Sequence, residues 1–147
     1  MFSCQSGQML PGSILYLGLA SSLGVTATPA MLDFVEQAEL TSIEHAKSAL
    51  SSSLQINHLL SGMASDGRLV VEGKNVQLAF GYPQAKKEEL EKVASFGTQI
   101  LENNTENQVI IWSMHKSWCF VYYQATDNKP AEISDIQSKN NNLCGSS

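Results

Sequence analysis

Three cysteines and three histidines are the side chains of this sequence best suited to nucleophilic or metal chemistry. His45, His58 and His115 lie far apart and lack the His-x₃-His or Glu-x-x-His spacing that holds zinc. The sequence also contains no glycine-rich phosphate loop, no Gly-x-Ser-x-Gly elbow and no cysteine beside a suitable base. We therefore expect no catalytic residue, no metal and no cofactor, and a protein that is not an enzyme.

The cysteines suggest a different use. Cys119 lies in the strand-like run Trp118–Tyr123, and Cys144 lies near the end of a polar tail. A bridge between them would hold the tail and stabilise the fold by roughly 3.5 kcal/mol in the chain-entropy estimate. Such a bridge indicates an oxidising compartment outside the cytoplasm, whereas two free thiols would indicate a reducing one. Cys4 is left over in either case.

The composition limits the domain count and the partners. With 147 residues, 43% of them hydrophobic, the chain can support one ordinary core and one additional segment. Its net charge of −5 and its single arginine, Arg68, leave no basic face for a phosphate backbone. We expect no nucleic-acid partner.

Charged residues begin only at Asp33. The uncharged stretch from Met9 to Leu32 exceeds the ~20 residues with which a helix crosses a hydrocarbon layer of ~30 Å. Its glycines and serines also suit close contact between helices. A cleaved secretory signal that ends at Val25-Thr26-Ala27 is the alternative, although the usual basic start of such a signal is absent.

After Pro29 the pattern becomes amphipathic. Apolar residues recur at helical spacing with polar residues between them (Leu32, Val35, Ile43, Ala46, Leu50 and Leu54). The spacing predicts a helix that ends near Leu60, before Ser61-Gly62. Pro29 either kinks one long helix from about Ser13 to Leu60 or begins a new helix at its first turn.

The remaining sequence predicts an α+β fold. Residues 68–71 and 76–80 flank a turn at 72–75 and predict a hairpin, after which Gly81-Tyr82-Pro83 should break the sheet. A second, short amphipathic helix is expected over 86–101. Strands follow at 108–112, 118–123 and, more weakly, 131–137, and the short connections favour an antiparallel sheet of about four to five strands.

The aromatic residues of these strands allow two interpretations. Trp112, Trp118, Tyr122 and Tyr123 would make a sugar-binding patch if they shared one exposed face. Side chains alternate between the faces of a sheet, however, so burial of half of them is favoured.

Three segments resemble type IV pilins, in particular the mannose-sensitive haemagglutinin (MSHA) pilins. VTATPAMLDFVEQAELTSIEHAKSAL at 25–50 is similar to the segment where the membrane-buried half of the pilin helix meets its amphipathic half. QLAFGYPQA at 77–85 is similar to a strand and Gly-Tyr-Pro turn of those pilins. Cys119 and Cys144 match the cysteines that close the C-terminal disulfide loop. The resemblance covers roughly Leu19 to the C-terminus.

The resemblance implies a filament subunit. Residues 1–32 would be a membrane and filament-core helical segment, with residues 1–7 as a residual leader, and residues 33–147 would form the globular head with the amphipathic half of the helix. Pilins are first held in the bacterial inner membrane, where prepilin peptidase cleaves and N-methylates them. They then assemble with copies of themselves or with other pilins into an extracellular pilus for adhesion or motility. In that setting Pro29 corresponds to the proline near which assembled helices can lose order.

The processing region differs from the family pattern. Counting from Pro29 places Gly7 at the cleavage position and Gln8 first in the mature chain, where phenylalanine is usual. Gly12 stands in place of the family glutamate, and Ser6 in place of a basic residue. Two explanations stay open: a start that is mis-assigned or frame-shifted upstream of about residue 18, or a minor pilin. A type II secretion pseudopilin is a further alternative, which is disfavoured because major pseudopilins typically have a calcium loop in place of the C-terminal disulfide. A soluble secreted binding module, released after Ala27, is another.

Overall fold

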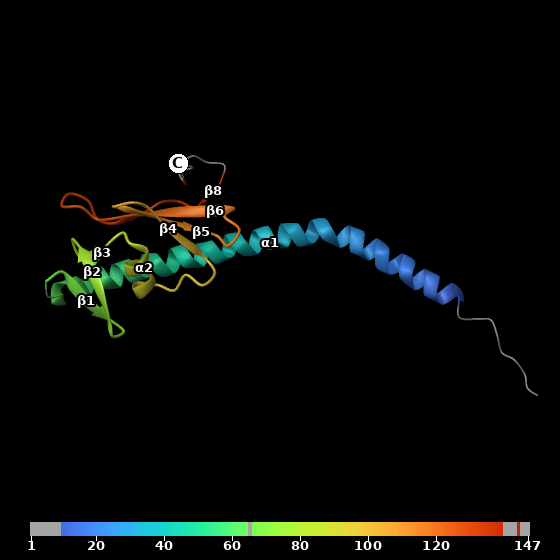
Figure 1. The fold of residues 1–147 in the computed structure, drawn as a ribbon, viewed down its shortest axis with the longest axis horizontal. Helices are drawn as coiled ribbons and strands as arrows, with labels where there is room; N and C mark the ends of the chain where they lie inside the picture. Colours follow the sequence, from blue (N-terminus) through green and yellow to red (C-terminus); the bar gives the residue numbers. More distant parts are fainter. Residues whose placement is uncertain (1–9, 65, 140–143, 145–147) are drawn as a thin grey trace, which may run out of the picture. The chain divides into compact units, whose positions relative to one another are not determined.

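The computed structural model describes residues 10–64, 66–139 and 144, with side chains from residue 31 onward. The chain divides into two compact units, Met1–Gln37 and Ala38–Ser147, which are described separately. The fold is α+β, with a long helix, two antiparallel sheets, a second short helix and a disulfide (Figure 1). The architecture expected from the sequence is thus confirmed in outline, except that two sheets replace one.

Helix α1 (Leu10–Leu60) makes up the described backbone of the first unit, from residue 10 onward, and continues into the second. It ends at Leu60, as predicted, and one 3₁₀ turn, η1 (Ser61–Met63), follows. The backbone is helical on both sides of Pro29. The loss of helical order near Pro29 in an assembled filament stays a prediction. Gly7, Gln8 and Cys4 lie outside the described residues. Over the part of the chain that the structure describes, no helix combines the length and apolar character that membrane crossing requires.

In the second unit α1 buries one face. Four of its apolar side chains are buried at helical spacing, namely Ile43, Ala46, Leu50 and Leu54. They belong to the same core cluster as Val109, Ile111, Phe120 and Tyr122 of the larger sheet. The predicted amphipathic helix therefore packs against an antiparallel sheet.

The larger sheet contains β4 (Ile100–Thr105), β5 (Gln108–Trp112), β6 (Trp118–Tyr123), β7 (Glu132–Ile133) and β8 (Gln137–Ser138). Strand order is β4-β5-β6, and both β7 and β8 pair with β6. Alternate residues of β5 face opposite sides, so Val109 and Ile111 join the α1 core while Ile110 and Trp112 join a second cluster with Cys119 and Cys144.

The weak strand expected over 131–137 is split into β7 and β8 because Ser134 interrupts it. The Ser134 N–H donates to the Val121 carbonyl at 2.9 Å, and the Val121 N–H donates to the Ser134 hydroxyl at 2.9 Å. A side chain thus replaces one main-chain partner of β6.

The smaller sheet corrects the prediction for Gly81-Tyr82-Pro83. It has the order β1-β2-β3, with β1 (Arg68–Val71), β2 (Lys74–Ala79) and β3 (Tyr82–Pro83). The predicted hairpin of β1 and β2 is confirmed. Tyr82 and Pro83 do not break the sheet, because a two-residue turn at Phe80-Gly81 returns the chain onto β2.

The helix predicted over 86–101 is also corrected. Helix α2 spans only Lys87–Val93, and Ile100 and Leu101 begin strand β4. Gly97 has a φ of +58°, which helical geometry forbids, and the Gln99 N–H donates to the Phe96 carbonyl at 3.0 Å. The apolar residues of this stretch are therefore shared between a short helix, a turn and a strand.

Candidate functional site

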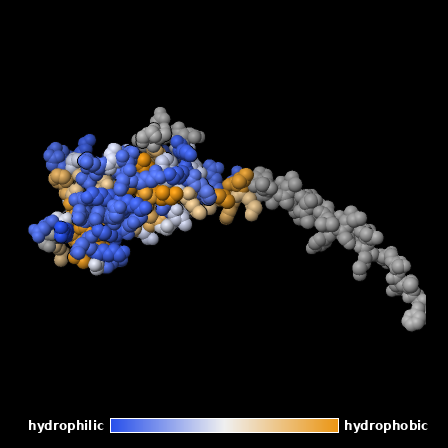
Figure 2. Space-filling model, in the orientation of Figure 1, coloured by the Kyte–Doolittle hydropathy of each residue, from blue (hydrophilic) through white to orange (hydrophobic). Residues whose placement is uncertain are grey.

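The first candidate site is a stretch of α1 whose apolar side chains lack cover in the first unit. Met31, Leu32 and Phe34 are 70%, 67% and 73% exposed, and Val35 is 48% exposed. Figure 2 shows hydrophobic side chains gathered on this stretch of α1. Contiguous exposed apolar surface of this kind is typical of an interaction site. We refer to Met31, Leu32, Phe34 and Val35, which flank the charged Asp33, as the apolar stretch.

The second candidate site is the β5–β6 loop, residues 113–117, which brings Ser113, His115 and Glu39 together. The Ser113 hydroxyl lies 3.3 Å from one carboxylate oxygen of Glu39, and the other oxygen accepts from the His115 N–H at 3.1 Å and from the His115 ring. Serine, histidine and glutamate are the residue types of a nucleophilic triad. Here, however, the carboxylate and not the histidine contacts the serine.

The surroundings of Ser113 show a structural role. Its hydroxyl accepts hydrogen bonds from the N–H groups of Ser117 and Trp118 at 3.1 and 3.2 Å, and its side chain is buried. A hydroxyl that accepts two main-chain N–H groups and donates to a carboxylate is neither free nor activated to attack a substrate. The group therefore fastens the β5–β6 loop to α1.

These contacts stabilise the negatively charged form of the Glu39 carboxyl group. Burial raises the pKa of the carboxyl, but the hydrogen bonds from the ring and main chain of His115 outweigh burial and leave the pKa below its ordinary value. The ionised carboxylate is thus the form that the fold stabilises.

A second carboxylate holds the other side of the same loop. Lys116 donates to Glu102, whose second oxygen accepts from the Trp112 indole N–H at 2.9 Å. The hydrogen bond from Lys116 lowers the pKa of Glu102, with burial acting weakly against it. Lys116 has a φ of +56°, and its amine also lies 5.8 Å from the centre of the Trp112 ring.

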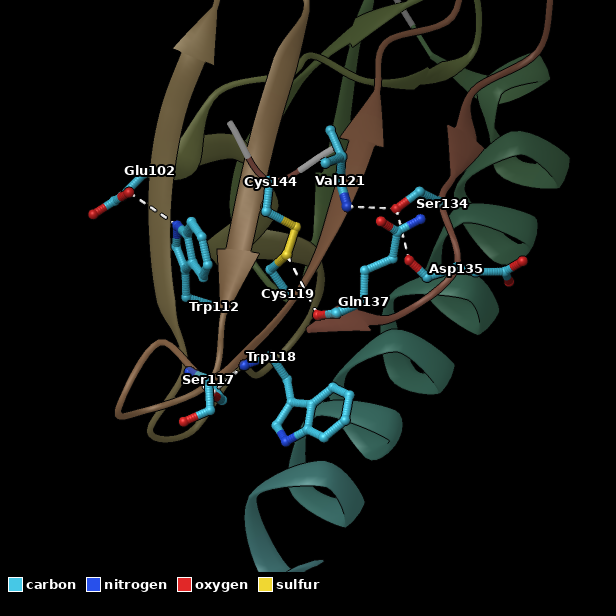
Figure 3. Close-up of a disulfide and its surroundings, with 11 residues drawn as sticks. Glu102, Trp112, Ser117, Trp118, Cys119, Val121, Ser134, Asp135, Gln137 and Cys144 are labelled. Atoms are coloured by element: carbon cyan, nitrogen blue, oxygen red, sulfur yellow. Dashed lines mark hydrogen bonds between the residues drawn. A yellow bond between two sulfur atoms is a disulfide. The ribbon is translucent and has the colours of Figure 1, made fainter. Parts of the chain in front are cut away.

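The disulfide expected between Cys119 and Cys144 is present, with the two Cα atoms 6.3 Å apart (Figure 3). Both cysteines are buried in the second core cluster beside Trp112 and Val121. The Cys119 sulfur also lies 3.6 Å from the Gln137 carbonyl. The bridge therefore joins the end of the chain to the face of the large sheet that α1 does not cover.

The aromatic side chains do not gather into one patch. Trp112 and Tyr122 are buried, on opposite faces of the sheet, while Trp118 and Tyr123 are partly buried. Trp112 and Tyr122 are therefore core residues, as the favoured interpretation predicted for half of the aromatic side chains. The Tyr122 hydroxyl donates to the Pro83 carbonyl at 2.6 Å and so links the two sheets.

The structure does not bring the three histidines together, since each contacts different residues or solvent. His115 meets Glu39, whereas the His58 ring stacks on Tyr82 with centroids 4.4 Å apart. Among the described residues, no group of three histidine, cysteine or acidic side chains could hold a metal ion.

A groove beside α1 was not predicted. It encloses about 590 Å³ between the last turns of α1, Tyr82 and the 131–133 segment. Its lining comes from three separate parts of the chain, so no local sequence pattern could have indicated it.

No protein-family model, curated protein or solved structure matches this chain.

Proposed function

We propose that this chain is a structural subunit of a type IV pilus, of the MSHA type, that acts in surface attachment, adhesion or motility. The observation that carries the proposal is the apolar stretch, whose four apolar side chains (Met31, Leu32, Phe34 and Val35) are each at least 48% exposed. A helix with uncovered apolar side chains gains stability when it packs against another copy. The sequence resemblance at 25–50 supplies the family.

The second unit fits the same role. The face of this unit that Figure 2 draws is largely hydrophilic, and its sheet is fastened to α1 while a disulfide holds Cys144. These features suit a head that faces an oxidising exterior. In this proposal the uncharged segment before Asp33 anchors the subunit in the inner membrane before assembly and then forms the filament core. Prepilin peptidase and other pilin subunits are the implied partners.

The proposal is tested by isolating sheared surface filaments from cells that express the full chain and sequencing its N-terminus by mass spectrometry. We expect the chain in the filament fraction, beginning at Gln8. A chain beginning at Thr28 in the culture fluid would instead identify a soluble secreted module. A chain found in the membrane fraction but never in filaments would favour a pseudopilin.

A further inference from the structure

The turn at Phe80-Gly81 carries a residue that its backbone disfavours. Both residues have positive φ, +52° and +84°, and together they form the two-residue loop between β2 and β3. Loops of this kind prefer Asn, Asp or Gly at the first position because an aromatic side chain crowds the left-handed backbone. Phe80 is nevertheless present, and its side chain is 62% exposed.

The chain has a matched comparison in its other tight hairpin. The loop between β1 and β2 is Glu72-Gly73, with φ values of +47° and +77°, and its first position is polar. The aromatic side chain at this positive φ is strained, and such strain is the observation that motivates a binding role for Phe80.

The turn is fixed against the end of α1. A Cβ atom on Gly81 would come within 2.9 Å of the Ser61 hydroxyl oxygen and 3.0 Å of the His58 ring, so only glycine fits. The stacking of His58 on Tyr82 holds the same junction. Phe80 is thus displayed from a rigid support.

Two open grooves meet at this junction. The larger, of about 590 Å³, is lined by Leu54, Leu59, Tyr82, Ala131 and Ile133 together with polar residues such as Ser51 and Gln55. The smaller, of about 360 Å³, is lined by Phe80, Tyr82 and Pro130 among others, and His58 and Tyr82 border both. We refer to this combined surface as the α1-end groove.

We propose that the α1-end groove receives the Met31, Phe34 and Val35 face of the apolar stretch of a second copy of this chain, with Asp33 on the opposite side of the helix. The inference rests on the proposed filament function and names the surface that the helix of the neighbouring subunit contacts. Met31, Phe34 and Val35 have the i, i+3, i+4 spacing by which an amphipathic helix fills an apolar groove.

Size and charge are compatible with this occupant. Five helical residues span ~6 Å from first to last Cα, and the groove follows α1 from Lys47 to Leu59, which is ~18 Å. Charged side chains of both signs line the groove, namely Lys47, Asp127, Lys129 and Glu132, so we expect apolar fit and not net charge to determine the contact. Donor and acceptor surfaces differ, and such contacts build open filaments when rotation does not close them into a ring.

The first test places the photo-crosslinker p-benzoylphenylalanine at position 34 of the full chain in filament-producing cells, followed by peptide mapping of crosslinked dimers. We expect crosslinks to peptides that contain residues 51–59, 80–82 or 130–133. Filaments whose crosslinks join residue 34 only to other regions would overturn the docking site but keep the filament function. Absence of both filaments and dimers would overturn both.

The second test uses Phe80→Asn, which suits the turn, with Val70→Asn as the control at another exposed apolar position, 65% exposed on β1. We expect Phe80→Asn to lower the filament yield at least tenfold while the unfolding midpoint stays equal or rises. Val70→Asn should leave the yield within twofold of wild type. An unchanged yield for Phe80→Asn would contradict the proposal.

Discussion

The carboxylate of Glu39 accepts a hydrogen bond from the main-chain N–H of His115 at 3.1 Å, across a sequence separation of 76. Because the same carboxylate contacts the Ser113 hydroxyl at 3.3 Å, α1 and the β5–β6 loop are joined at one point. Helix α1 therefore both packs on the larger sheet and is hydrogen-bonded to the β5–β6 loop.

Replacement of this carboxylate should destabilise the head. We expect Glu39→Gln to lower the free energy of unfolding by about 1–3 kcal/mol, because the charged acceptor of buried and main-chain donors is lost. Denaturant unfolding of the purified full chain measures the change. Glu44→Gln, which removes an exposed carboxylate from the same helix, is the control and should change stability by less than about 0.5 kcal/mol. Equal effects of the two variants would contradict the role of Glu39.

Stability should also depend on pH through the two loop carboxylates. Folding lowers the pKa of both Glu39 and Glu102, so the unfolded chain binds these protons more readily than the folded chain. Their contribution is complete above the ordinary carboxyl pKa of 4.5 and decreases as the pH falls below that value.

Unfolding curves recorded between pH 7 and pH 3 test this dependence. The double variant Glu39→Gln, Glu102→Gln should show a flatter decline of stability than wild type below pH 4.5. Parallel declines would show that other groups determine the acid sensitivity.

The disulfide should hold the C-terminal end of the chain. Its partners are 25 positions apart, and loss of a bridge over that distance costs roughly 3.5 kcal/mol in the chain-entropy estimate. We expect Cys144→Ser to lower stability by about this amount and to increase hydrogen exchange at β8. A Cys144→Ser protein as stable as wild type would contradict a stabilising bridge.

The Tyr122 hydroxyl should couple the two sheets. Burial raises the pKa of this phenol, which therefore stays protonated and donates to the Pro83 carbonyl. Tyr122→Phe keeps the packing but leaves that carbonyl without this donor, for an expected loss of about 1–3 kcal/mol. Tyr123→Phe on the same strand, where the side chain is only partly buried, should cost less. The reverse order would exclude this coupling.

The elements predicted correctly from the sequence are those with a clear local period. Helix α1, the β1–β2 hairpin and strands β5 and β6 follow from the spacing of apolar residues and from turn residues at 72–73. Strand β4 was missed because Leu90–Leu101 also fits a helical face, and only pairing with β5 selects the strand at Ile100–Leu101.

The sites were less predictable because they depend on distant parts of the chain. The Cys119–Cys144 pairing could be proposed, since only two cysteines lie beyond the uncharged segment. The contact of Glu39 with His115 and the α1-end groove each join segments far apart in sequence, and neither leaves a local pattern.

The central claim is that the apolar stretch drives assembly, and filament yield of a Phe34→Asp variant tests it most directly. The variant places a charge among side chains that packing would desolvate, whereas Ser48→Asp adds the same charge at another exposed site of α1. Electron microscopy and immunoblotting of sheared surface material should show filaments for Ser48→Asp and none for Phe34→Asp, at equal cellular levels of subunit. Wild-type filament yield from Phe34→Asp would contradict the claim.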